Sequence, residues 1–160
     1  MRYLNASPGN IVIRNCRFDQ ERELIRIEYD TRHRFCCNRP LHDITIENCV
    51  ISDLIDTGMV WGDAKEKVTC HFKNVRIACR EGRGDTPLLV AANFERLIFE
   101  DCTIEGYDEP TILVESASDG AVEVIRSTPV TVKRATREEC FAAHPGGIHS
   151  GDRGKNLVFV

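Results

Sequence analysis

The chain has 160 residues and a formal net charge of −4, with 42% hydrophobic and 29% charged residues. This acidic balance argues against a nucleic-acid partner, because phosphates are usually met by a basic face. No apolar run approaches the roughly 18 residues that cross a bilayer, and the first residues lack the apolar segment of a signal peptide. We therefore expect no membrane partner and a cytoplasmic protein as the chain stands, although a longer parent protein would allow export.

A short pattern recurs along the chain: apolar, any residue, apolar, any residue, Asn or Asp, a small residue, any residue, apolar. Successive copies of the small residue are 33, 26, 27 and 25 positions apart, and a period in the twenties is typical of a solenoid. The longer first step contains an insertion at residues 29–41. The small residues of the five copies are Cys16, Cys49, Val75, Cys102 and Ser127.

The phase of the apolar residues slips inside each clear copy. Ile44 and Ile46 alternate as in a strand with one buried face, but the next apolar pair is Cys49 and Ile51. A sharp bend at Asn48 explains the slip, because Asn and Asp tolerate the left-handed backbone that such a bend needs. We expect the same one-residue corner, joining two short strands, at Asn15, Asn74 and Asp101.

A further apolar segment follows each copy, at residues 23–27, 58–61, 86–90 and 111–114. About three short strands per turn predict an all-β fold, a right-handed parallel β-helix of about five coils. We assign residues 1–136 to the coils and 137–160 to a C-terminal capping segment that begins with a short helix. A β-sandwich or a mixed α/β domain is the competing interpretation.

The eight cysteines invite three explanations. A domain of this length does not need a disulfide framework, and no C-x-x-C spacing suggests zinc. In a stacked solenoid the small residues form an internal column, so we interpret most cysteines as buried, reduced thiols. We accordingly predict neither a metal nor a cofactor.

The segments NIVIRNCRF, LIRIEYD and PLHDITIENCVISDL resemble the pectin-lyase-like superfamily. The chain is most similar to the C-terminal coils of polygalacturonase-type glycoside hydrolases, over roughly residues 9–132. The resemblance implies a protein that binds or cleaves acidic polysaccharide along the outer face of one sheet. If it is an enzyme, the resemblance implies a polygalacturonase-like hydrolase or a polysaccharide lyase.

The catalytic motifs of those hydrolases are missing from this sequence. It contains no Asn-x-Asp, Asp-Asp or Gly-His-Gly, and Arg-Ile-Lys is matched only in part, by Arg26-Ile27-Glu28. The pair of carboxylates that glycoside hydrolysis requires cannot be placed on any residue here. The start of the repeat close to Met1 leaves two explanations, a fragment lacking its N-terminal coils or a homo-oligomer in which another subunit covers the end.

Polar residues of the first coil and its insertion form the predicted substrate-binding set, because arginines there can hold a sugar carboxylate bidentately. The alternative is a solvated loop whose charges pair with one another. The set is Arg26, Glu28, Asp30, Arg32, His33 and Arg34, with Asp63 at the edge of the second coil.

On the later coils we expect the outer face to be apolar and covered by the tail, a loop or a partner subunit. Trp61, which alternates with Met59, is expected to point into the core. The residues placed outside by this reasoning are Val60, Gly62, Leu89, Ala91, Leu113 and Glu115.

Two functions follow from these observations. The first is a carbohydrate-associated β-helix, part of or related to a pectin-type hydrolase or lyase but without a recognisable catalytic set. The second is a non-catalytic structural or oligomer-forming module. Acidic polysaccharide and a second copy of the chain are the corresponding partners.

Overall fold

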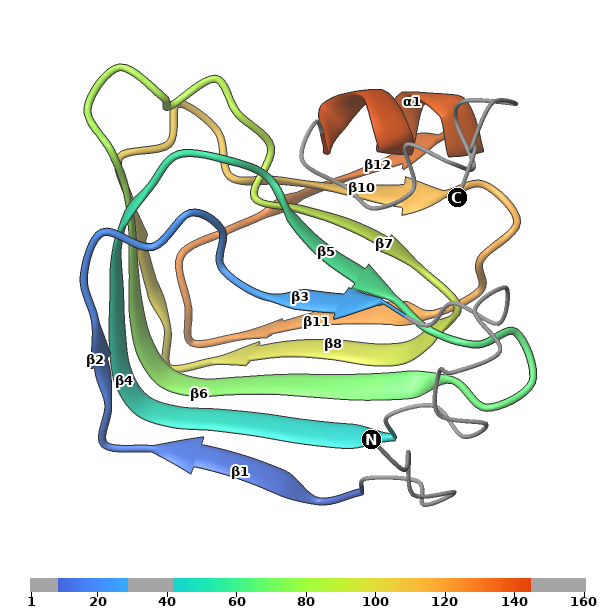
Figure 1. Cartoon of the computed structure of the whole chain (residues 1–160), viewed down its shortest axis with the longest axis horizontal. Coiled ribbons are helices and arrows are strands. Elements are labelled where there is room, and N and C mark those ends of the chain that lie inside the picture. Colours follow the sequence, from blue (N-terminus) through green and yellow to red (C-terminus); the bar gives the residue numbers. More distant parts are fainter. Residues whose placement is uncertain (1–8, 29–41, 145–160) are drawn as a thin grey trace, which may run out of the picture.

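The computed structural model describes residues 9–28 and 42–144; predictions for residues 1–8, 29–41 and 145–160 lie outside this part of the chain. Strands dominate it, and its one helix is short (Figure 1). No helix in these ranges is long and apolar enough to span a membrane. The elements are β1 (Ile11–Arg14), β2 (Arg17–Phe18), β3 (Arg26–Glu28), β4 (Asp43–Leu54), β5 (Gly58–Trp61), β6 (Val68–Cys79), β7 (Leu89–Ala92), β8 (Phe94–Glu100), β9 (Thr103–Glu105), β10 (Thr111–Glu115), β11 (Ala121–Ile125), β12 (Thr131–Ala135) and α1 (Arg137–Ala143).

The strands form two sheets, and every pairing found in the described ranges is parallel. The first sheet has the order β1-β4-β6-β8-β11, with β2 beside β4 and β9 beside β6. The second has the order β12-β10-β7-β5-β3. Each repeat therefore adds a strand to both sheets, and the two sheets enclose a common core (Figure 1). The all-β prediction is confirmed.

The repeats stack in the register that the sequence pattern predicts. Ile44 of β4 pairs with Ile11 of β1 and with Cys70 of β6; Ile44 and Cys70 belong to the core, and Ile11 packs against it. The small residues Cys49 and Cys102 are buried in this core. Like positions of successive repeats thus lie in columns along the stack.

The predicted corners are present. Asn15, Asn48, Asn74 and Asp101 have φ values of 56°, 53°, 51° and 52°, in the left-handed region. The Asn74 side-chain amide donates to Asn48 Oδ1 at 2.8 Å, which links neighbouring corners. The structure differs from the prediction in one respect, because β4 and β6 continue through the bend as single 12-residue strands (Figure 1).

Substitution of Asn48 tests the corner. Asn48→Val is expected to lower the free energy of unfolding by about 1–2 kcal/mol more than Asn48→Gly, since a β-branched residue is strained at φ 53°. Both variants lose the hydrogen bond to Asn74, so their difference isolates the backbone conformation. Urea unfolding measures it, and equal stabilities of the two variants would contradict the assignment.

The cysteines behave as structural thiols. Six are free in the described ranges, and no disulfide joins any of them. Cys102 Sγ donates to Phe72 O at 3.3 Å, and burial raises the pKa of the Cys102 and Cys70 thiols. Burial likewise raises the pKa of Cys140 to about 11. A raised pKa leaves little nucleophilic thiolate at neutral pH.

The assignment of faces in the second sheet was wrong for the second and third repeats. Val60, Leu89 and Ala91, expected outside, belong to the main core, whereas Met59 and Trp61 lie in a separate cluster on the outer face. In these two repeats the sequence does not reveal which alternate side chains face the core, because both sets are apolar. The first and fourth repeats were assigned correctly, since Arg26 and Glu28 mark the outer face of the first repeat and Glu115 marks that of the fourth.

The outer cluster is covered by the chain's own helix. Thr136 caps α1 and forms a capping box with Glu139, which explains why the helix starts here. Phe141 packs on Trp61 with ring centroids 4.9 Å apart, and Arg137 lies over the Trp61 ring. The expected cover of the apolar strip is thus the C-terminal segment, which lies along the side of the second sheet (Figure 1).

Candidate functional site

Three of the seven predicted substrate-binding residues can be located. Arg26 and Glu28 lie on β3 at the edge of the second sheet, paired with Met59 and Trp61 of β5. Asp63 follows β5, and its Oδ2 accepts hydrogen bonds from the backbone N–H groups of Lys65 and Glu66 at 2.8 and 3.0 Å. Such a carboxylate holds a turn in shape. Asp30, Arg32, His33 and Arg34 lie outside the described residues.

Arg26 belongs to a partly buried polar cluster that links the first repeat to the residue that follows α1. Its Nη2 lies 2.7 Å from Glu23 Oε1, and His144 Nε2, just after α1, lies 2.7 Å from Glu23 Oε2. The side chains of His144 and Glu23 are only 1% and 13% exposed. Arg26 therefore holds a carboxylate of this chain, and a sugar carboxylate would compete with Glu23 for it.

The electrostatics of this cluster favour an ionised Glu23. Burial by itself raises the pKa of this carboxyl, but hydrogen bonds and charges from His144 and Arg26 outweigh burial and lower it. Glu23 is thus suited to hold the helix end in place and unsuited to donate a proton at neutral pH. Sequence reasoning missed this pair, because 121 residues separate its members and no motif marks either of them.

The outer face of the first sheet carries charges that pair between neighbouring repeats. His71 Nε2 lies 2.9 Å from Glu100 Oε2, and Arg14 Nε lies 3.0 Å from Glu47 Oε1. His71 and Glu100 come from adjacent strands and are diagonal neighbours in the register. The repeat alignment therefore contained the signal for this pair, although the sequence interpretation did not use it.

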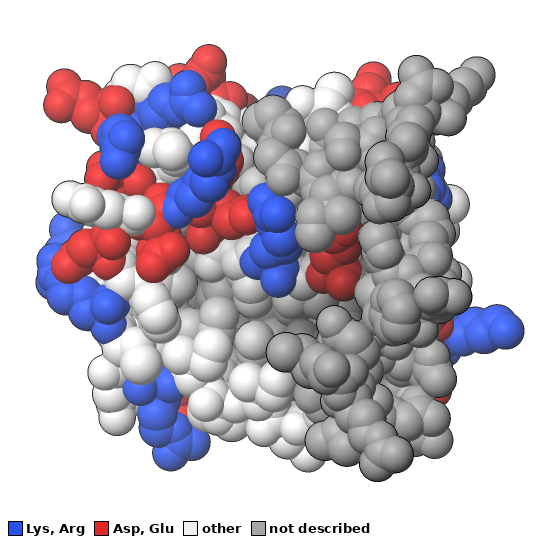
Figure 2. All heavy atoms as spheres, viewed as in Figure 1, with Lys and Arg blue, Asp and Glu red and all other residues white. Residues whose placement is uncertain are grey.

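A second charged region covers the connections that lead into the second sheet. Figure 2 shows acidic and basic side chains interleaved at the upper left, where these connections lie in Figure 1. Arg80 binds Asp53 bidentately at 2.9 and 2.7 Å and lowers the pKa of that carboxyl. Asp56, nearly buried, lies 2.6 Å from Arg22 Nε and 3.5 Å from Arg83 Nη2. These groups neutralise one another and leave little excess charge to attract an ion.

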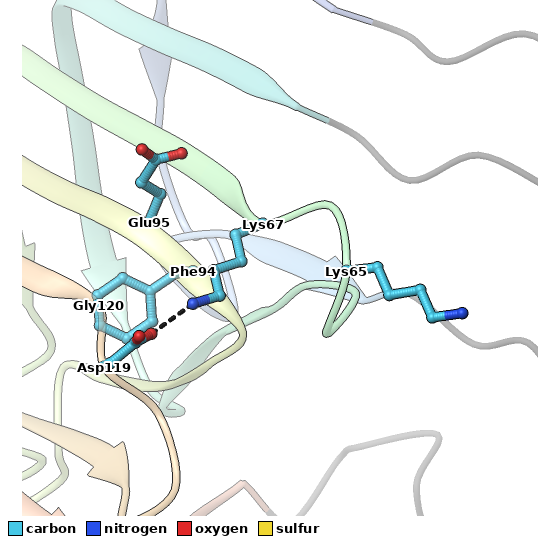
Figure 3. A pocket seen from close by; sticks show the side chains of 6 residues that line it. All are labelled: Lys65, Lys67, Phe94, Glu95, Asp119 and Gly120. Carbon is cyan, nitrogen blue, oxygen red and sulfur yellow. Dashed lines mark hydrogen bonds and ion pairs between the residues drawn. The ribbon is translucent and has the colours of Figure 1, made fainter.

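A shallow polar pocket of about 380 Å³ lies where the chain passes from the second sheet to the first (Figure 3). Lys67 extends across it to an ion pair with Asp119, whereas Lys65 points away from it. Gly120 is required beside it, because a Cβ there would lie 2.4 Å from Phe94 O. The lining residues are Lys65, Lys67, Phe94, Glu95, Asp119 and Gly120.

Comparison of the chain with protein-family models, curated proteins and solved structures finds no match. The chemistry of the site therefore rests on its own geometry. Among the described residues, no group of three or more His, Cys, Asp or Glu side chains is arranged to hold a metal ion. What these residues present is a stack of parallel strands with paired charges on its sides, a small lysine-bearing pocket and open strand edges at its ends.

Proposed function

We propose that the chain is a right-handed parallel β-helix related to the pectin-lyase-like superfamily. Three features support the β-helix: two parallel sheets that each gain one strand per repeat, corners at Asn and Asp residues, and columns of like residues along the stack. The right-handed sense follows from the strong preference for right-handed crossovers between parallel strands of one sheet.

We further propose that this β-helix is a non-catalytic module that acts by self-association. One observation carries this proposal: the large apolar side chains that are exposed in the described ranges all lie on edge strands. They are Val12 (46% exposed) on β1, Val124 (39%) and Ile125 (36%) on β11, and Val132 (46%) on β12. Sheet edges with exposed apolar residues are the surfaces on which another chain adds.

Sedimentation velocity over a range of protein concentrations tests whether the chain self-associates. We expect the weight-average sedimentation coefficient to rise with concentration as the chain associates. A strictly monomeric chain at the highest soluble concentration would contradict the proposal.

Carbohydrate association is a second candidate, favoured by the lysine-bearing pocket. Lys67 places an ammonium group in an open hollow, where a uronate carboxylate would compete with Asp119 for it, and Lys65 lies at the rim with its side chain pointing away. Arg26, with Arg32 and Arg34 of the insertion, remains the other predicted contact set for acidic polysaccharide.

Calorimetric titration with oligogalacturonate tests this candidate. We expect the double variant Lys65→Ala/Lys67→Ala to bind at least about tenfold more weakly than the unaltered chain, because it loses both ammonium groups. Lys73→Ala, on the outer face of the first sheet, is the matched control and should bind normally. Absence of binding by the unaltered chain, or equal loss in both variants, would contradict the candidate.

A further inference from the structure

The C-terminal end of the stack has three segments, and two of them are closed to a further strand. In the segment after the last corner, Ser127 Oγ and Thr128 Oγ1 accept hydrogen bonds from the backbone N–H groups of Cys102 and Ile104 at 2.8 and 3.0 Å. Pro129 follows and has no N–H to offer a partner strand. Side chains thus fasten this segment to the preceding repeat in place of a backbone ladder, and the segment forms no regular strand that a further strand could extend.

A charged side chain protects the open edge of strand β12 against pairing with a further strand. Arg134 pairs in register with Val114, a core residue, so it occupies a core-side position at the end of the stack. Its Nη1 donates to the backbone carbonyl of Ser118. A charged side chain at an inward position is a known device against strand addition.

The strand β11 lacks such protection. Val122 pairs with Leu97 and Val124 with Phe99, so both valines continue core columns, yet Val124 is 39% exposed. In the described ranges β11 pairs only with β8, and its other edge is open. One end of the stack thus offers a five-residue strand edge beside apolar core positions.

Head-to-tail stacking of a second copy fits this end poorly. The register of the second sheet continues Lys133 into the column of Arg26 and Arg134 into the column of Ile27. Stacking the first repeat of another copy on the last would therefore place two cations side by side and an arginine against a core isoleucine. Both contacts are unfavourable.

An antiparallel contact between two copies of the same edge avoids both problems. With Glu123 on the two-fold axis, Val122 of each copy faces Val124 of the other, and Arg126 comes next to the Asp119–Gly120 turn of the other copy. Arg126 and Asp119 carry opposite charges and have side chains 65% and 79% exposed, although within their own chain they already pair with Asp101 and Lys67. The two Glu123 carboxylates repel, but each lies 2.7 Å from an Arg96 nitrogen of its own chain.

We propose that a second copy of this chain binds at β11, pairing antiparallel with it to form a closed two-fold dimer through the C-terminal ends of the two stacks. The contact is isologous, so it ends at two subunits instead of growing into a filament. The inference rests on the proposed self-association and names its surface and partner.

Sedimentation equilibrium of two matched variants tests the contact. Val124→Lys, at the β11 edge, is expected to weaken the dimer at least about tenfold, because it puts an ammonium group into the apolar seam. Val12→Lys, at a similarly exposed valine on the opposite edge strand β1, should leave the dimer unchanged. Glu123→Gln should strengthen it severalfold by removing the repulsion at the axis.

Hydrogen exchange supplies a second measurement that does not depend on mass. The backbone amides of residues 121–125 should exchange more slowly as the concentration of the unaltered chain rises, and not in Val124→Lys. A dimer that survives Val124→Lys, or is broken by Val12→Lys, overturns the contact and leaves self-association standing. A monomeric unaltered chain overturns both proposals.

Discussion

Phe99→Ala is expected to lower the free energy of unfolding by about 3–5 kcal/mol, the cost of emptying a large aromatic site in a packed core. The Phe99 side chain is fully buried in the main core and stacks on Phe72 with ring centroids 5.0 Å apart. The two rings come from adjacent repeats and share one column. Since a domain of this size has about 5–15 kcal/mol in total, the variant should lose a third or more of its stability unless the chain lies at the top of that range.

Urea unfolding followed by far-ultraviolet circular dichroism measures this loss. Val12→Ala is the matched control, because Val12 is exposed and its truncation should cost less than about 0.5 kcal/mol. Similar losses in the two variants would mean that the Phe column does not form the centre of the core. A loss well below 1 kcal/mol in Phe99→Ala would lead to the same conclusion.

His144→Ala should release the end of α1 from the first repeat. Removing one hydrogen-bond partner of a largely buried carboxylate costs about 1–3 kcal/mol, and here Glu23 keeps only Arg26. The helix covers Trp61, the single tryptophan of the chain, so its release should shift the native fluorescence to longer wavelength. Tryptophan fluorescence during urea titration reports both whether the helix still covers Trp61 and the free energy of unfolding.

Glu138→Gln, on the exposed side of the same helix, is the control for this variant. It should leave the tryptophan spectrum unchanged and alter stability by less than about 0.5 kcal/mol. If His144→Ala keeps both the native spectrum and the native midpoint, the cluster of Glu23, Arg26 and His144 does not hold the helix.

The candidate site could be predicted only in part. Arg26 and Glu28 were placed on the outer side of the first repeat, and they flank Ile27, which belongs to the main core. Their surroundings could not be foreseen, because Glu23 and His144 meet only once α1 lies across the second sheet. Asp63 was predicted as a binding residue, and the hydrogen bonds of its Oδ2 to two backbone N–H groups add a turn-forming role that the prediction did not include.

Features read correctly from the residues alone are those set by local chemistry. The period of the repeat, the left-handed corners at Asn15, Asn48, Asn74 and Asp101, and the buried small column follow from backbone preferences and alternation within a few residues. The direction of Trp61 and the helix that covers it depended on packing between distant segments. Where both faces of a strand are apolar, its pattern is compatible with either orientation, and the choice is made by which neighbouring element buries each face.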